Sequence, residues 1–194
     1  MGNKKGHRTL NVISVNPDSL NKTALTNILA AMTKRQIHIA AIQETHIQRD
    51  QDYYIGHYRI ISTKAEKREN DQGNVTYVGG VSTILDITLA DKVKTINRIT
   101  QRITYVTLDT KNNPIPVTIL NTYAPHSGYT IIEKGKYWEE VKKTYKNISK
   151  HHLTIWATDN NGQLGRPKTT TKSRVENIIG PHTHYTPLVK KGTE

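Results

Sequence analysis

Residues 10–43 read LNVISVNPDSLNKTALTNILAAMTKRQIHIAAIQ, and this stretch decides the fold. Its two ends, LNVISV at 10–15 and HIAAIQ at 38–43, are apolar runs with β-branched residues, so both are expected to be buried strands. Between them, apolar residues recur with the spacing of one helix face, at Leu25, Ile28, Leu29 and Met32. This order predicts two parallel strands that are neighbours or near-neighbours in one sheet.

The rest of the chain predicts more strands than helices. Strands are expected at 53–63, 75–87, 102–109, 117–123 and 153–157, and a helix over the stripe Trp138, Val141, Tyr145 and Ile148. An exposed loop is expected at 64–74, a bulge or close backbone packing at Gly79-Gly80, and a hairpin turn at Asn112-Asn113-Pro114. The whole pattern predicts an α/β layered sandwich with two packed mixed β-sheets flanked by helices. The alternative, a doubly wound parallel sheet, needs more helices than the sequence offers.

The composition indicates a basic and polar protein. The 194 residues include 28 Lys and Arg against 16 Asp and Glu, which gives a net charge of +12 and a pI of about 9.8. Such a charge favours a polyanionic partner, most often nucleic acid; a merely soluble basic surface is the alternative. No apolar run approaches the ~20 residues of a membrane helix, so no membrane partner is expected. The absence of Cys excludes disulfides and cysteine nucleophiles and fits an intracellular protein.

Four polar segments each follow an apolar strand. They are Asn16-Pro17-Asp18, Gln43-Glu44-Thr45-His46, Asn121-Thr122-Tyr123-Ala124-Pro125-His126 and Asp159-Asn160-Asn161-Gly162-Gln163. Layered α/β folds place their sites at the carboxyl ends of strands, so these segments are expected to meet. Together they offer carboxylates, amides, a phenol and imidazoles without a thiol, which suits Mg²⁺, Ca²⁺ or Mn²⁺ rather than zinc.

Each segment also has a plainer explanation. Asn16 and Asp18 could form an Asx turn that caps the next helix, and Glu44 could lie at a solvated strand end. Tyr123 could be a packed aromatic residue before a proline turn, and residues 159–162 have the composition of an ordinary turn. The order of all four along the chain favours a shared site over four separate coincidences.

At these residues the sequence resembles the endonuclease/exonuclease/phosphatase superfamily, and more narrowly the apurinic-like endonuclease domain of non-LTR (LINE-type) retrotransposons. The resemblance rests on short motifs: residues 42–46 (IQETH) are similar to Q-E-T-H, 121–125 (NTYAP) to N-x-Y-A-P, 159–166 (DNNGQLGR) to G-D-F-N-A-x-x-G-R, 14–20 (SVNPDSL) to W-N-V-D-G-L, and 180–182 (GPH) to G-P-H-G. It covers roughly residues 9–185.

The resemblance implies a metal centre. Glu44 would be the principal ligand of a Mg²⁺ ion, with Mn²⁺ as a possible substitute. Asp18 would be a second carboxylate linked to the metal, and Asn16 would orient the metal shell or the phosphate.

The resemblance also implies groups that act on the phosphate. Tyr123 would hydrogen-bond the scissile phosphate, Asp159 would position or deprotonate the attacking water, and Asn161 would contact the phosphate and stabilise its charge. A further set is expected to contact nucleic acid or phosphate: His46, His126 and Arg166.

Two departures from the family pattern stand out. Thr158 and Asn160 occupy positions where the family has Gly and Phe around the Asp, which loosens that motif. Nothing after Arg166 resembles the final S-D-H motif, so the fold is expected to lack its last strands. The sequence therefore predicts a basic tail at 1–8, an incomplete domain of this family at 9–185, and a tail at 186–194.

The function that the resemblance implies is Mg²⁺-dependent hydrolysis of a phosphodiester by a DNA endonuclease that nicks target DNA for retrotransposition. The protein is expected to be a monomer that acts on DNA in the nucleus. It is also expected to be fused to a reverse transcriptase or to act with one. Two alternatives stay open: a catalytically impaired remnant that binds nucleic acid, and a phosphoesterase that acts on another substrate.

Overall fold

The computed structural model describes residues 9–109 and 115–162. The chain divides into two compact units, Met1–Asn160 and Asn161–Glu194, and the fold described here is that of the first unit. Its strands are β1 (Val12–Val15), β2 (Ile39–Ile42), β3 (Gln51–Ile55), β4 (Tyr58–Thr63), β5 (Glu66–Glu69), β6 (Val75–Val78), β7 (Val81–Asp86), β8 (Val93–Thr100), β9 (Ile103–Leu108), β10 (Val117–Tyr123) and β11 (Leu153–Asp159). Its helices are α1 (Lys22–Lys34), α2 (Ile87–Ala90) and α3 (Ile131–Asn147).

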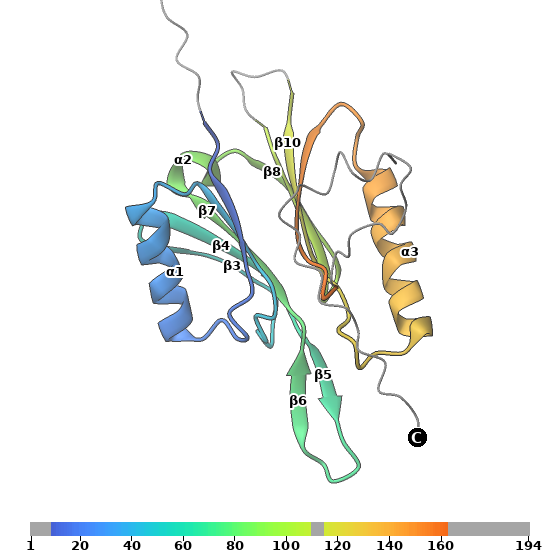
Figure 1. Ribbon diagram of the computed structural model, residues 1–194. Helices are drawn as coiled ribbons and strands as arrows, with labels where there is room; N and C mark the ends of the chain where they lie inside the picture. The colour runs from blue at the N-terminus through green and yellow to red at the C-terminus, as the bar shows by residue number, and fades with distance from the viewer. Residues whose placement is uncertain (1–8, 110–114, 163–194) are drawn as a thin grey trace, which may run out of the picture. The chain divides into compact units, whose positions relative to one another are not determined.

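Two mixed sheets form the centre of this unit (Figure 1). One has the order β1-β2-β7-β4-β3 and the other the order β11-β10-β9-β8. Each contains one parallel pair, β1 with β2 and β10 with β11, among antiparallel neighbours. The parallel β1–β2 pair, joined through α1, confirms the arrangement predicted from residues 10–43.

Apolar side chains between the sheets form the main core. Ile39, Ile61 and Leu85 of the first sheet pack with Val106 and Ile119 of the second, and all five are fully buried. Burying such side chains contributes about 1.5–3 kcal/mol each. This interface holds the two sheets face to face and confirms the predicted sandwich of two packed mixed sheets.

One helix covers the outer face of each sheet. Ile28 and Met32 of α1 pack on Ile42 and Ile84 of the first sheet. Tyr137 and Val141 of α3 pack in a cluster with Leu120 of the second sheet. Figure 1 shows the resulting order of layers, from α1 through the two sheets to α3.

Several sequence-based boundaries were wrong because turns interrupt the predicted strands. The strand expected at 53–63 is a hairpin of β3 and β4 that turns at Gly56, where φ is +53°. The strand expected at 75–87 is broken at Gly79-Gly80, as positive φ values there end β6 before β7 begins. The two glycines pack closely against neighbouring backbone, which confirms the close backbone packing predicted for this pair.

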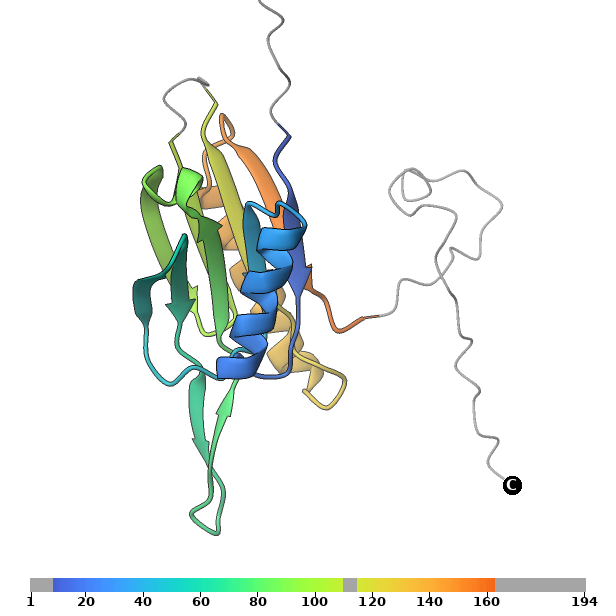
Figure 2. The ribbon, with the colours of Figure 1, turned by 90° about the vertical axis from the view of Figure 1, so that its left-hand side faces the viewer.

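Other differences arise from polar or short elements. The loop expected at 64–74 contains β5, which pairs with β6 in a hairpin that extends away from the sandwich (Figures 1 and 2). Neither α2 nor β8 was predicted, because α2 is a single turn and most residues of β8 are polar. The turn expected at 112–114 lies outside the described residues.

The buried face of α3 is rotated from the predicted one. Tyr137, Val141 and Thr144 face the sheet, whereas Trp138 and Tyr145 are 42% and 56% exposed. Val141 and Ile148 of the predicted stripe are buried as expected, and only the two aromatic residues chosen with them, Trp138 and Tyr145, lie off the buried face. Among the described residues, no helix combines the length and apolar character that crossing a membrane requires.

Candidate active site

Predicted site residues lie at the carboxyl ends of β10 and β11 and in the loops that follow β1 and β2. Because β1 and β2 are parallel, with Val15 opposite Ile42, the segments that follow them leave the first sheet at the same edge. In the second sheet the parallel pair places Tyr123 directly opposite Asp159. The topology therefore delivers two polar segments from each sheet.

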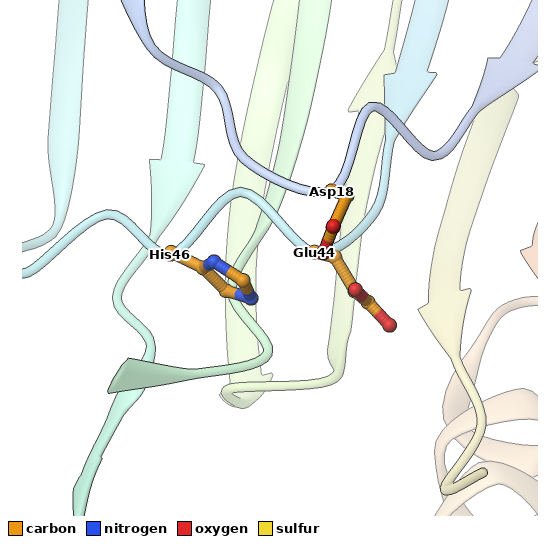
Figure 3. A group of neighbouring side chains, drawn as sticks. All are labelled: Asp18, Glu44 and His46. Carbon is orange, nitrogen blue, oxygen red and sulfur yellow. The ribbon is translucent and has the colours of Figure 1, made fainter. Parts of the chain in front are cut away.

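Asp18, Glu44 and His46 form a group with the geometry of a metal site. One ligand atom from each lies within 4.8 Å of the others. Figure 3 shows Asp18 on the loop after β1 and both other residues on the loop after β2. Two carboxylates suit a hard divalent cation, and an added imidazole suits Mn²⁺ or a later transition metal better than Mg²⁺. The donor set of these residues thus fits a divalent metal, and His46 lies among the candidate ligands.

The backbone at these three residues is left-handed. Their φ values are +55° at Asp18, +50° at Glu44 and +55° at His46. Such conformations cost of order 1–3 kcal/mol each for residues other than glycine and persist only where the surroundings impose them. Here the loops are fixed by the Leu20 amide, which donates to the Thr45 carbonyl over 3.1 Å, and by the His46 amide, which donates to the Gly79 carbonyl over 3.0 Å.

Glu44 is held in a partly buried position. This burial raises the pKa of Glu44 above its ordinary value. The polar Asn16 side chain lowers that pKa in part, and the nearby Asp18 carboxylate raises it further. Two carboxylates this close repel each other when both are charged. A cation between them would relieve that repulsion.

Asn16 connects the two sheets. Its Nδ2 donates to the Asp159 carboxylate over 2.8 Å, across 143 residues of sequence. Its Oδ1 accepts from the Asp18 amide over 3.0 Å, which is the Asx turn considered from sequence. Asn16 also lies close enough to Glu44 to lower the pKa of that carboxyl, so this one side chain lies between the carboxylate-bearing ends of β2 and β11. Glu44 and Asp159 therefore lie in the same site.

Tyr123 is almost completely buried, with 2% of its surface exposed. The guanidinium of Arg102 lies over its ring, 4.7 Å from the centroid, and the Tyr123 amide donates to the Arg102 carbonyl over 2.9 Å. Beyond it, the Ala124 amide donates to the carbonyl of Asp159 over 2.8 Å, so the β10 and β11 pairing continues to the strand ends. The packed aromatic considered from sequence is thus observed, at a position beside Asp159.

Two residues of the predicted polar segments form a buried amide pair that the sequence analysis did not predict. Gln43 Nε2 donates to Asn121 Oδ1 over 2.8 Å, and Asn121 Nδ2 donates to the carbonyl of Ser82 over 2.9 Å. Both side chains lie between the sheets with at most 1% exposure. Gln43 lies one residue before Glu44, and Asn121 lies two residues before Tyr123. The pair therefore anchors two of the site segments. A polar residue at the end of an otherwise apolar strand was the available signal.

The remaining predicted residues are His126, Asn161 and Arg166. His126 is exposed; its Nδ1 accepts from the Gly128 amide over 3.1 Å, and its ring meets Tyr129 edge-on. Asn161 has a φ of +43° and is the first residue of the second unit. Arg166 lies outside the described residues. The structure thus brings together Asn16, Asp18, Glu44, His46, Tyr123 and Asp159.

Comparison with solved structures identifies the fold. The endonuclease domain of TRAS1, a telomere-specific non-LTR retrotransposon, matches with a TM-score of 0.54 and 20% identity, over 80% of this chain and 61% of that one. The AP endonuclease LMAP from Leishmania major matches with a TM-score of 0.55 and 17% identity, over 77% and 54%. An endonuclease/exonuclease/phosphatase family protein from Leptotrichia buccalis gives 0.52 and 13%, over 80% and 67%.

These matches confirm the resemblance at the level of the fold, which is that of the endonuclease/exonuclease/phosphatase proteins. This chain spans 61% and 54% of the first two matched structures. No protein-family model matches the sequence, and the search of curated proteins found no match.

Proposed function

We propose that this chain carries a metal-dependent phosphodiesterase site of a DNA endonuclease that nicks target DNA for retrotransposition. The observation that carries the proposal is the Asn16 side chain, which links the Asp159 carboxylate of one sheet to the Glu44 end of the other. A retrotransposon endonuclease domain among the structures of the same fold supports the DNA substrate. The proposal includes a reverse transcriptase acting on the nick, in the nucleus.

The metal would be held by Asp18 and Glu44, with His46 as a nitrogen ligand. Bound there, a divalent cation supplies positive charge for the phosphate oxygens. Mg²⁺ fits the two carboxylates, and the imidazole favours Mn²⁺.

The chain's own groups would do the rest of the chemistry. Asp159, oriented by Asn16, would align the attacking water and accept its proton. Tyr123 would hold a phosphate oxygen. This donor is neutral, so it does not compete with the carboxylates for the cation.

A nicking assay tests this proposal. The full chain is incubated with supercoiled plasmid in Mg²⁺ or Mn²⁺, and each of Glu44→Gln and Asp159→Asn is expected to reduce nicking at least about 100-fold. The control is Glu139→Gln, an exposed carboxylate on α3, which should leave the rate unchanged. Removal of divalent metal with a chelator should abolish nicking.

Other outcomes separate the alternatives. Plasmid binding without nicking in either metal would favour the catalytically impaired remnant. Hydrolysis of a small phosphoester without action on plasmid would favour a phosphoesterase for another substrate. Nicking that survives both substitutions would refute the assigned site.

A further inference from the structure

Arg102 is a buried charge without a counter-ion in the described part of the chain. The side chain stands at the entry to β9, and the residue is only 6% exposed. It forms no salt bridge with any described carboxylate, and its Nη1 atom is buried with no hydrogen-bond partner. Burying an unpaired charge lowers the stability of a fold. The described residues thus satisfy this guanidinium only in part.

Two tyrosine rings enclose the guanidinium. Its central carbon lies 4.7 Å from the ring centroid of Tyr123 and 4.9 Å from that of Tyr129, and Nη2 donates to the Tyr129 hydroxyl over 2.8 Å. Cations over aromatic faces are attracted by the ring quadrupole, most strongly where water is excluded. Arg102 therefore fixes two side chains that belong to the ends of β10 and the following loop.

The enclosed charge lies beside the proposed site. Tyr123 is opposite Asp159 in the strand register, and the Tyr123 amide also donates to the Arg102 carbonyl. The buried Nη1 atom is not open to a ligand, so Arg102 acts on a bound group through the tyrosines and through its field. A positive charge over a phenol ring withdraws electron density and makes its hydroxyl a stronger donor.

We infer that Arg102 is a positioning residue for phosphate binding: it orients Tyr123 and Tyr129 and supplies a buried positive charge to the phosphodiester of the DNA. This inference rests on the proposed function. It differs from an ordinary surface contact because the charge never reaches the phosphate, and so it displaces no counterion from the DNA.

The test compares Arg102→Met and Arg102→Lys with the wild-type chain. Affinity for a short DNA duplex is measured in a chelator, where no cleavage occurs, over a range of salt concentrations, and thermal unfolding is followed alongside. Arg102→Met is expected to unfold at the same or a higher temperature, because an apolar side chain of similar length removes an unpaired buried charge. Its DNA affinity should fall about tenfold, with the slope of log affinity against log salt unchanged.

Arg102→Lys keeps the charge but loses the planar group, so it should recover part of the affinity. The matched control is Arg59→Met, which removes an arginine that is paired with Asp52 over 2.8 Å. That substitution should lower stability and leave DNA affinity unchanged.

Three outcomes would overturn the inference. The first is an Arg102→Met protein that loses stability but keeps its DNA affinity, which is the result of a structural role. The second is a salt slope that falls by about one, which marks direct phosphate contact. The third is an Arg102→Lys protein that folds like wild type and binds DNA no better than Arg102→Met. Because binding is measured without cleavage, failure of the proposed nuclease activity would appear separately, in the plasmid assay.

Discussion

At the scale of single residues, Arg59 shows what a satisfied arginine looks like in this protein. Its Nε and Nη2 donate to the two carboxylate oxygens of Asp52 over 2.8 and 2.9 Å, and Nη1 donates to the carbonyl of Ala90 over 2.9 Å. Such bidentate pairs are the stronger kind of charged hydrogen bond. This arginine ties β4 to β3 and to α2, whereas Arg102 has no carboxylate partner among the described residues.

The Asp52–Arg59 pair predicts a pH dependence of stability. The hydrogen bond from Arg59 holds the pKa of Asp52 below its ordinary value. A carboxyl with a lowered pKa in the folded state contributes stability above its unfolded pKa, and that contribution is lost as the pH falls through the folded pKa. Asp52→Asn should therefore be less stable than wild type near pH 7, and the difference should shrink below about pH 4.

Urea unfolding at a series of pH values measures this difference. Because the Asp52–Arg59 pair is partly exposed, the difference in unfolding free energy should be modest. The pair Lys67 and Glu69 provides the comparison, since both side chains are more than half exposed and lie 3.9 Å apart. Glu69→Gln should leave the pH profile unchanged; an Asp52→Asn profile that runs parallel to wild type throughout would contradict the prediction.

At the scale of elements, the break between β6 and β7 positions the metal-site loop. Gly79 and Gly80 have φ values of +79° and +82°. A Cβ atom at Gly80 would lie 2.5 Å from Thr45 Oγ1 and 3.2 Å from the His46 amide nitrogen. The glycine thus lets the loop that carries Glu44 and His46 pass directly over the strand break.

Gly80→Ala should be costly for both reasons. A positive φ and a close contact together predict a loss of more than about 2 kcal/mol of unfolding free energy. Gly73→Ala is the matched control, because Gly73 has a φ of +78° with nothing within 4 Å of the added atom. It should lose only about 1 kcal/mol, from backbone conformation alone.

Chemical denaturation gives both values. A Thr45→Ala substitution in the Gly80→Ala protein removes the nearest obstructing atom and should restore part of the loss. Equal losses at Gly73 and Gly80 would show that the close approach to Thr45 has no energetic weight.

The elements also show what the sequence could and could not predict. Residues 10–43 predicted β1, α1 and β2 because apolar runs and the helical spacing of apolar residues can be recognised within a short stretch of sequence. The hairpin of β5 and β6 escaped prediction because Glu66–Glu69 is fully charged and becomes a strand only by pairing with Val75–Val78. The candidate site residues were proposed from short motifs, whereas the roles of Arg102 and of the Gln43–Asn121 pair depend on partners far away in sequence.

At the scale of the whole folded unit, the two sheets are joined by polar contacts as well as by the apolar core. Gln43 of the first sheet and Asn121 of the second share a buried hydrogen bond of 2.8 Å. Removing one partner of such a pair leaves a buried amide unsatisfied, which costs about 1–3 kcal/mol. The sandwich is therefore held in register by a specific contact next to the site.

A double-mutant cycle on Gln43→Leu and Asn121→Leu tests this role. Each single substitution should lower the unfolding free energy by about 2 kcal/mol, and the double substitution should cost at least about 1 kcal/mol less than the sum. Equilibrium unfolding in urea gives the four values. Strictly additive losses would mean that the two amides stabilise their own sheets independently.

The Asn16 contact between the two sheets has a consequence for when the protein would become active during synthesis and folding. Half of the proposed site comes from the segments that follow β1 and β2, which are synthesised early, and the other half from the ends of β10 and β11. Under the proposed function neither half would work alone, so a nascent or partly opened chain would not cut DNA. Cleavage would begin only once the two sheets have packed together. A transient separation of the sheets would stop cleavage before the chain unfolds.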